Sequence, residues 1–590
     1  MAKLVALVSL LLLASGCGRR SPSAELAQLS EEFVDTTLAF SPAAATAAGL
    51  HVYRKQNLDE MLDDMSPANL DRQLRYYQGF RGRLDKLNTA QLNAEDRADM
   101  ILLRDQCGLQ ILDLSDIQSA AHNPMVYAET LGQALFTPLV LEYAPKADRM
   151  GHIIARLRQV RLFLSQAEIN LSTAPPVWTE LAEGETQANI DMVDKTIRDA
   201  VPGNLQDAYS HAAQPALDAM RQYLDFLKNS LSRRTADWRL GDRYSGKFRL
   251  AMHSSMEADS VLSEATRDLA AERAHMMEIA LPLHAKLAPA HHDHTDLEGD
   301  ARQNQVIGEV LAHIAERHST RDSYLDDARK DLAEARAFVR QKHLLTLPAH
   351  ANLQVVPTPP FERGVYTAGG FDPAPPLEPQ LGAFYWVTPI PPQWPDEQAN
   401  SKLREYNEYM LRLLTLHEAI PGHYVQFELA GEVQPPARRV LRALYGSGPY
   451  VEGWAQYSEQ MMLEQGYLND SPELALTFAK QQLRVISNAI LDVRLQMLDM
   501  SNQEALDFLE KQAFQEPQEA VEKLQRAKAT SAQLPTYYVG WTQWNKLRDE
   551  IKKAHGASFN LQDFHDRALK EGAVPFEVLR QLLLQAPQQP

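Results

Sequence analysis

The segment His417-Glu418-Ala419-Ile420-Pro421-Gly422-His423 carries side chains of the types that can bind a metal ion and use it in catalysis. In the common H-E-x-x-H motif, two histidines four residues apart lie on one face of a helix, and the glutamate between them activates a metal-bound water. Here the histidines are six residues apart, which on a straight helix separates their side chains by roughly 120°. A regular helix through this segment would therefore not chelate a metal.

Pro421 and Gly422 stand where the helix can depart from regular geometry. Proline cannot donate the helical hydrogen bond to the carbonyl of His417, and glycine adopts backbone angles that other residues resist. If the two surplus residues loop out, His423 returns to the position of an ordinary second ligand, and Glu418 stays beside His417 as the general base. The alternative is an ordinary helix that ends at Pro-Gly and carries two surface histidines.

Two downstream glutamates, Glu452 and Glu459, lie seven residues apart in a helical pattern and share a face. A catalytic zinc takes three protein ligands and leaves one position for water. We expect His417, His423 and Glu452 to supply this set, one zinc per chain, because the Gly-Trp pair after Glu452 suggests close packing. Glu459 would then orient a ligand histidine or be solvated. The alternative for Glu452 is an interaction with the helix dipole.

Residues 360–590 resemble a bacterial family of unknown function, DUF885, which includes many lipoproteins and carries H-E-x-x-P-G-H followed by E-G-W-A. Further positions match the Arg and Asp of a later helix and an R-Y-x-x-x-P-G-Q-A-L-S-Y-K-x-G segment of the family: Arg484, Asp492, Arg526, Gln533, Tyr537 and Gly540. The chain departs from the family at Ser531-Ala532, where Pro-Gly is usual, and at Tyr538, where the family has lysine. The metal motif itself is intact.

That family is in turn similar to the all-helical zinc peptidases of the neurolysin and angiotensin-converting-enzyme kind. The resemblance implies peptide-bond hydrolysis, whereas the residues themselves imply only a metal-activated water. It also implies that Tyr537 steadies the oxyanion; packing against the core with a satisfied hydroxyl is the alternative. Zinc would lower the pKa of its water toward ~7, and Glu418 would take the proton and pass it to the leaving amine.

Arginines downstream of the motif suggest how a substrate could be held. Arg484 or Arg494 could fix a substrate carboxylate through a bidentate pair, which would select for carboxypeptidase or dipeptidase action. The alternative for each is an exposed or ion-paired helix residue. Two other functions use the same residues: a non-catalytic envelope lipoprotein that binds a peptide or partner, and a metal-dependent amidase or esterase acting on non-peptide substrates.

The proline-rich segment 348–400 differs from the rest of the chain. It contains Gly369-Gly370 and the aromatic run Phe384-Tyr385-Trp386-Val387. This run predicts an edge strand just before the metal helix, where it could bind an extended peptide through its main chain, with Tyr385 contacting substrate. The alternative is a long loop that covers the helical body.

A second group of candidate metal ligands is His291-His292-Asp293-His294. Such a crowded run could chelate a transition metal weakly, but its flanks are typical of a solvated loop.

The N-terminus is typical of a bacterial lipoprotein signal. A positive start is followed by an apolar run from Leu4 to Leu13, too short to span a bilayer permanently, and by small residues that end at Cys17. We expect Cys17 to carry the lipid; a simple secretory signal is the alternative. The absence of an acidic residue at position 18 favours the outer membrane, facing the periplasm. Cys107 is the only other cysteine, so a lipidated Cys17 leaves no intramolecular disulfide.

Composition and periodicity predict a large, predominantly all-α protein, and the family resemblance implies a metallopeptidase-like helical body with a cleft. Of the 590 residues, 45% are hydrophobic and 23% charged, which is ordinary globular composition, and the net charge of −18 argues against nucleic-acid binding. Apolar residues recur at helical spacing before residue 347. The expected organisation is a signal peptide (1–17), a tether (18–30), an N-terminal helical region (31–347), the proline-rich segment with short strands (348–400) and a catalytic helical region (401–590).

Overall fold

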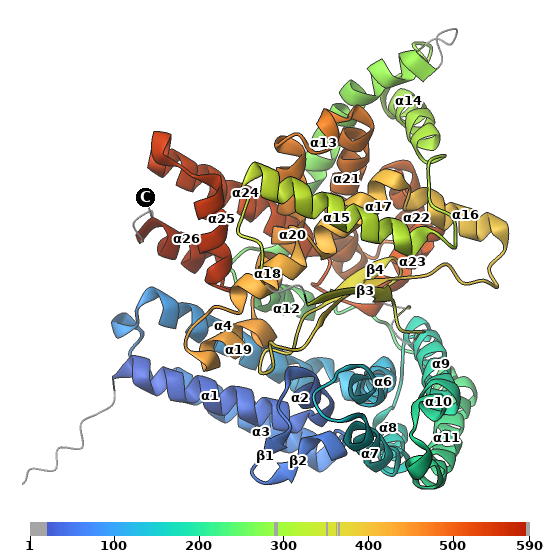
Figure 1. Cartoon of the computed structure of the whole chain (residues 1–590), viewed down its shortest axis with the longest axis vertical. Helices are drawn as coiled ribbons and strands as arrows, with labels where there is room; N and C mark the ends of the chain where they lie inside the picture. Colours follow the sequence, from blue (N-terminus) through green and yellow to red (C-terminus); the bar gives the residue numbers. More distant parts are fainter. Residues whose placement is uncertain (1–20, 288–292, 350–351, 361–362, 364–365, 586–590) are drawn as a thin grey trace, which may run out of the picture.

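The structure, a computed structural model, describes residues 21–287, 293–349, 352–360, 363 and 366–585. It is 72% helical and 4% strand, which confirms the predicted predominantly all-α fold. Figure 1 shows the helices of the first part of the chain, blue to teal, gathered on one side of the molecule and the C-terminal helices, orange to red, on the other, with a small sheet between them.

The N-terminal helices build a core of their own. Helices α6, α7, α8, α9 and α11 bury one continuous cluster of aliphatic and aromatic side chains. Helix α1 begins after Ser21, whose hydroxyl accepts a hydrogen bond from the amide of Ala24, so the predicted tether is helical from Pro22 onward. The elements are α1 (Pro22–Phe40), α2 (Pro42–Ala48), the hairpin β1 (Val52–Tyr53) and β2 (Gln56–Asn57), α3 (Pro67–Leu84), α4 (Ala94–Leu112), α5 (Ser119–His122), α6 (Met125–Val140), α7 (Lys146–Leu157), α8 (Val160–Asn170), α9 (Pro176–Asp191), α10 (Arg198–Ala200) and α11 (Gln206–Asn229).

The next four helices precede the proline-rich segment in sequence but pack with the C-terminal half. They are α12 (Arg243–Met252), α13 (Ala258–Leu287), α14 (Gly299–Ile314) and α15 (Tyr324–Lys342). Helix α13 packs along α21 (Pro472–Met497), and α15 packs on α17 (Glu408–Glu418). The predicted boundary at residue 347 therefore falls inside one packed body.

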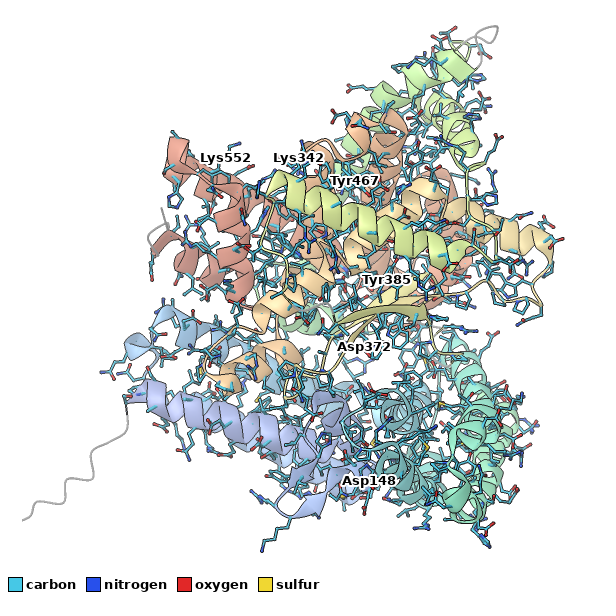
Figure 2. All side chains as sticks on the ribbon, viewed as in Figure 1. Asp148, Lys342, Asp372, Tyr385, Tyr467 and Lys552 are labelled. Atoms are coloured by element: carbon cyan, nitrogen blue, oxygen red, sulfur yellow. The ribbon has the colours of Figure 1, made fainter. Side chains whose placement is uncertain are left out.

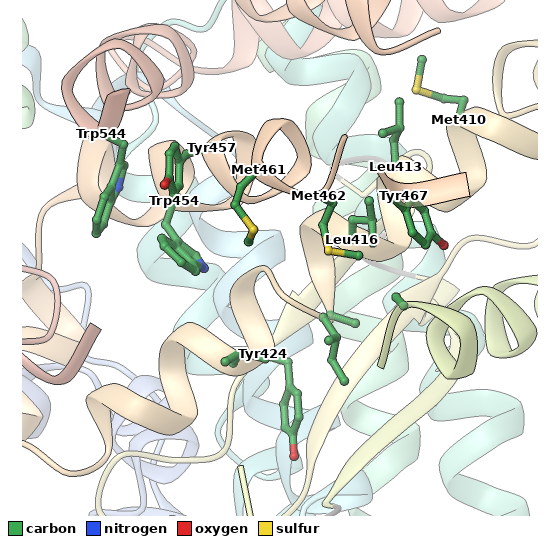
Figure 3. Close-up of a cluster of buried hydrophobic side chains, with 14 of the residues drawn as sticks. Met410, Leu413, Leu416, Tyr424, Trp454, Tyr457, Met461, Met462, Tyr467 and Trp544 are labelled. Atoms are coloured by element: carbon green, nitrogen blue, oxygen red, sulfur yellow. The ribbon is translucent and has the colours of Figure 1, made fainter. Parts of the chain in front are cut away.

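The C-terminal helices surround a core rich in aromatic residues, including Trp454, Tyr457 and Trp544 (Figure 3). Helices α20 and α24 touch at their backbones: a Cβ added to Gly453 would lie 2.2 Å from the carbonyl carbon of Gly540. This contact fixes α20 against α24. The remaining helices are α16 (Asp396–Glu405), α18 (His423–Ala430), α19 (Pro436–Tyr445), α20 (Gly448–Glu464), α22 (Asn502–Lys511), α23 (Pro517–Ala529), α24 (Pro535–His555), α25 (Leu561–Lys570) and α26 (Phe576–Gln585).

The proline-rich segment forms a three-stranded sheet in the order β3 (Leu353–Pro357), β5 (Ala383–Val387), β4 (Gly369–Asp372). Strand β5 is parallel to β3 and antiparallel to β4. The predicted aromatic strand exists, but it is the central strand rather than an edge, and β4 is an edge. Figure 2 labels Tyr385 on β5 and Asp372 on β4, between the two groups of helices.

None of the helices in the described residues combines the length and the apolar character needed to cross a bilayer.

Candidate metal centre

The backbone is not helical between the two histidines of the motif. Helix α17 ends at Glu418 and α18 begins at His423. In the turn between them, the Gly422 amide donates a hydrogen bond to the Leu416 carbonyl at 2.9 Å, and a Cβ on Gly422 would lie only 1.8 Å from the His417 carbonyl oxygen. Only glycine fits there. Trp454 fastens the turn by donating its indole hydrogen to the Pro421 carbonyl at 3.0 Å.

This turn brings the two imidazoles together despite their wide spacing in sequence. The ring centroids of His417 and His423 lie 4.8 Å apart, with the rings nearly perpendicular at 86°. The motif thus forms a helix, a tight turn and a second helix, rather than one continuous helix with a bulge. Both side chains line the same internal cavity.

Glu452 on α20 supplies the third group. Its Oε2 atom lies 3.7 Å from His417 Nε2 and 3.5 Å from His423 Nε2. Ligand atoms bound tetrahedrally to zinc lie about 3.3–3.5 Å apart, so the spacing fits one shared ion. This oxygen is buried and accepts no hydrogen bond from any described residue. An orphaned carboxylate oxygen beside two imidazole nitrogens is the arrangement that a bound cation would satisfy.

The ionisation of Glu452 agrees with this arrangement. Burial alone would raise the pKa of Glu452, but the adjacent imidazoles of His417 and His423 outweigh it and hold the pKa well below its usual value. The carboxylate is therefore charged and available as a ligand.

Glu418 faces the same cavity and lies close enough to take part in its chemistry. The ligand atoms of His417, Glu418 and His423 all lie within 4.8 Å of one another. Burial raises the pKa of Glu418, and the two histidines oppose that shift. With Glu452 in contact with both Nε2 atoms, Glu418 is left as a free carboxylate with increased affinity for a proton.

Glu459 holds His417 in place through Nδ1, the ring nitrogen that does not contact Glu452. Its Oε1 atom lies 2.9 Å from His417 Nδ1, and the side chain is completely buried. The same Nδ1 atom lies 3.0 Å from Gln456 Nε2, and a proton on Nδ1 directed at Glu459 would leave the Nε2 lone pair facing Glu452. His423 has a counterpart in Gln426, whose Oε1 atom lies 3.3 Å from His423 Nδ1. The sequence analysis did not single out Gln426, although its position one helical turn after His423 was an available signal.

Tyr537 lies beside His417, with its ring centroid 6.4 Å from the imidazole. Arg526 donates to the phenol oxygen at 3.0 Å and Gln533 does so at 3.4 Å. Because both partners donate, the phenol's own hydrogen is available to the cavity. Burial raises the pKa of Tyr537 and the charge of Arg526 opposes it. The three family-matched residues of this segment thus form one unit.

Asp492 stabilises the loop that precedes Tyr537. Its Oδ2 atom accepts hydrogen bonds from the Tyr244 hydroxyl at 2.6 Å and from the Ala532 amide at 2.9 Å. Burial raises the pKa of Asp492 to about 6. Ala532 has a φ of +59°, in the left-handed region that glycine favours, which agrees with the glycine that the family resemblance implies at this position.

The cavity has a volume of about 420 Å³ and is lined by the metal-site residues, by β4 and by part of α21 and α23. Gly369, Gly370 and Phe371 of β4 form one wall, and Phe371 lies against the ring of His423 with centroids 6.3 Å apart. A cationic wall is formed by Arg484, Lys523 and Arg526. The sequence analysis missed Lys523, since nothing near it in sequence marks it as part of a site.

Three predicted substrate-binding residues have different outcomes. Arg484 lines the cavity, but it is ion-paired with Glu519. Arg494 is not among the described residues that line it. Tyr385 is fully buried with its hydroxyl 3.1 Å from that of Thr415, and it does not line the cavity either, so the structure does not support its predicted contact with substrate. Its position on the central strand explains this outcome.

The second group of candidate ligands is only partly described, since His291 and His292 lie outside the described residues. His294 Nε2 is 3.2 Å from Glu309 Oε2, which also lies 2.7 Å from His284 Nε2. This cluster joins α13 to α14 and lies apart from the cavity. Cys17 also lies outside the described residues.

The fold and the cavity define a class: a large helical protein with an internal site of two histidines and a glutamate beside a further free carboxylate. The chain belongs to the family described as bacterial protein of unknown function (DUF885), whose model matches residues 42–583. This finding confirms the predicted family.

Two solved structures share the fold. A putative lipoprotein of unknown function from Shewanella oneidensis is 28% identical, with a TM-score of 0.75 over 95% of this chain and 100% of that chain. A putative lipoprotein from Colwellia psychrerythraea is 18% identical, with a TM-score of 0.75 over 95% of this chain and 98% of the other, and it shows the fold alone. No curated protein sequence matches the chain.

Proposed function

We propose that the protein is a zinc-dependent peptidase of the bacterial cell envelope. The observation that carries this proposal is the buried Oε2 atom of Glu452, which accepts no hydrogen bond from any described residue and lies 3.5–3.7 Å from both Nε2 atoms of the histidine pair. A free carboxylate, Glu418, faces the same space. A purely structural ion pair would need neither the second carboxylate nor the adjoining cavity.

The residues around the cavity have complementary roles in this proposal. Zinc supplies an acidic water and polarises a carbonyl oxygen. Glu418, whose pKa is raised by burial, accepts the proton of the attacking water and passes it to the leaving nitrogen. Tyr537, with its hydroxyl hydrogen directed at the cavity by Arg526 and Gln533, donates to the developing oxyanion.

Strand β4 supports a peptide as the substrate. It is an edge strand of the sheet, and its residues Gly369 and Gly370 line the cavity. Because glycines carry no side chain, the main chain of β4 lies close to the cavity, and an extended peptide could add along this edge as a further strand. The peptide-binding edge that the sequence analysis assigned to residues 384–387 is here assigned to β4.

The N-terminal sequence and the solved relatives support a location in the envelope. Both structural relatives are described as putative lipoproteins, and Cys17 ends a lipoprotein-type signal in this chain. We infer that lipid on Cys17 anchors the protein to the outer membrane, facing the periplasm. Replacing Cys17 with alanine should move the protein from the membrane fraction to the soluble fraction.

The decisive experiment combines metal analysis with a digest of a peptide library read by mass spectrometry. We expect about one zinc per chain and cleavage products that disappear after chelation and return with added zinc. The positions of the cleaved bonds would show from which end the peptides are shortened. Stoichiometric zinc without any cleaved peptide would contradict the peptidase, and a protein that binds no zinc would remove its basis.

A further inference from the structure

The cavity has two chemically different halves. The metal half carries the carboxylates Glu418 and Glu452. The other half, contributed by α21 and α23, carries the cationic side chains of Arg484, Lys523 and Arg526. Cations that line an internal cavity without balancing anions indicate what the cavity is built to receive.

Most of the positive charge around this wall is already balanced. Glu519 accepts from Lys402 at 3.0 Å and is also paired with Arg484, and Glu522 accepts from Lys402 at 2.6 Å. Lys480 lies 2.7 Å from Glu405. These carboxylates are therefore shared among Lys402, Lys480 and Arg484.

Lys523 has no such partner. Its side chain lines the cavity and the residue is only 4% exposed. Within the described part of the chain, its ammonium group makes no ion pair and no hydrogen bond. Burial, together with the charges of Arg484 and Arg526, outweighs the nearby Glu519 carboxylate and lowers the pKa of Lys523 well below its usual value. An anion in the cavity would therefore favour the charged form of this side chain.

Arg526 lies next to Lys523 in this wall and also has no carboxylate partner among the described residues. It donates hydrogen bonds to the neutral oxygens of Gln533, at 3.2 Å, and Tyr537, at 3.0 Å. Because Tyr537 lies against His417, Arg526 places positive charge close to the metal half of the cavity. The charges of Arg526 and Glu418 are near enough to influence each other.

We propose that Lys523, assisted by Arg526, binds a carboxylate group of the substrate beside the bond to be cleaved. This inference rests on the proposed peptidase function and names the chemical class of its substrate. The carboxylate can come from two sources: the C-terminus of a short peptide or an acidic side chain. Arg484 also lines this wall, but Glu519 already balances its charge, so we assign it no direct contact with the carboxylate.

Calorimetric titration of the purified protein carrying Glu418→Gln tests this inference without turnover. Three probes separate the sources. N-acetyl-alanyl-alanine has a free C-terminal carboxylate, its C-terminal amide has no carboxylate, and the C-terminal amide of N-acetyl-alanyl-glutamic acid has only the side-chain carboxylate. If the C-terminus is bound, the first probe should bind at least ~10-fold more tightly than its amide, since a charge-assisted contact is lost. If an acidic side chain is bound, the third probe should show that preference over the alanyl amide.

Lys523→Met supplies the variant and Lys480→Met the matched control. Lys523→Met should abolish the preference for the carboxylate and raise the melting temperature by about 2 °C, because it removes an amine whose burial is unfavourable. Lys523→Arg should keep the preference. Lys480→Met makes the same chemical change, but it leaves Glu405 without its lysine partner and should lower the melting temperature while the preference remains.

The outcomes separate this inference from the function on which it rests. Equal binding of acid and amides, a preference unchanged in Lys523→Met, or a lower melting temperature in that variant would overturn the carboxylate site. A preserved preference for the acid in a protein that cleaves no peptide would overturn only the peptidase proposal.

Discussion

In the proposed function, Glu418 is the residue that separates hydrolysis from metal binding. It lies within 4.8 Å of His417 and His423, yet Glu452 already contacts their Nε2 atoms. Glu418→Gln should therefore lower kcat by about 10²–10⁴-fold while the zinc content stays near one per chain. Steady-state cleavage of a library-derived peptide and elemental analysis of the same sample measure both effects.

A control for this substitution is available on the same helix. Glu408 lies in the first turn of α17, is only partly buried and is not among the described residues that line the cavity, so Glu408→Gln should leave kcat and zinc content unchanged. Retained turnover in Glu418→Gln would dismiss this residue as the base.

We expect Glu459 to affect metal affinity at the proposed site without being a ligand. Its hydrogen bond to His417 Nδ1, at 2.9 Å, fixes the tautomer and the direction of the imidazole. Because such outer contacts commonly contribute to affinity, Glu459→Gln should weaken zinc binding by about 10–100-fold. Competition with a chromophoric chelator measures the change, and Glu464→Gln, near the end of the same helix, should not produce it. Unchanged affinity would show that Glu459 is only a buried structural residue.

At this scale, helical spacing is sufficient to propose Glu452 and Glu459 on one face, and the types of residue are sufficient to propose His417 and His423. The role of Lys523 could not be predicted from the sequence, because it depends on the nearby carboxylate of Glu519 being paired with other cations. Those cations lie on α16 and α21, in distant parts of the chain.

At the scale of elements, the sequence predicts a disturbance at Pro421-Gly422 but not its form. The chain ends one helix and starts another, because the Gly422 amide bonds to Leu416 and the Trp454 indole holds the Pro421 carbonyl. Similarly, the aromatic run at residues 384–387 predicts a strand. Its central place depends on pairing with both β3 and β4, which the local pattern does not specify.

The contact between α20 and α24 positions Glu452 relative to Tyr537. A Cβ on Gly540 would lie 1.9 Å from the Pro449 carbonyl oxygen, so an added methyl group would force the two helices apart. Gly540→Ala should destabilise the protein by about 1–3 kcal/mol and reduce kcat, since α24 must shift away from the site. Urea denaturation and peptide cleavage measure these effects.

The matched control is Gly184→Ala on α9, where the added Cβ would meet nothing within 4 Å. This variant should be stabilised by a few tenths to about 1 kcal/mol, because alanine favours the helix. Equal stability of the two variants would show that the α20–α24 contact adapts easily.

At the scale of the whole molecule, the site depends on parts of the chain that composition assigns to different regions. Arg442 on α19 is buried and bonds Asp99 on α4 at 2.9 Å, which fastens the N-terminal helices to the C-terminal half. The predicted division at residue 347 follows a change in composition, whereas the packing of α13 and α15 follows tertiary contacts that periodicity does not reveal.

The N-terminal helices contain a buried carboxylate that makes their stability depend on pH. Burial raises the pKa of Glu185 on α9 to about 9, and the nearby Glu129 contributes to the shift. The folded state therefore binds a proton more tightly than the unfolded chain, whose ordinary value is 4.5. The resulting stability is fully present below pH 4.5 and is lost as the pH rises toward 9.

Glu185→Gln should remove this dependence, because an amide keeps the shape of the protonated acid and cannot ionise. Relative to the parent, the variant should gain stability as the pH rises, by up to about 1.4 kcal/mol per pH unit between pH 5 and pH 8. Urea denaturation at both pH values measures the difference, and Glu180→Gln on the exposed face of α9 should show none. A gain that is the same at pH 5 and pH 8 would mean that Glu185 is ionised in the folded protein, with its charge balanced by solvent rather than by a retained proton.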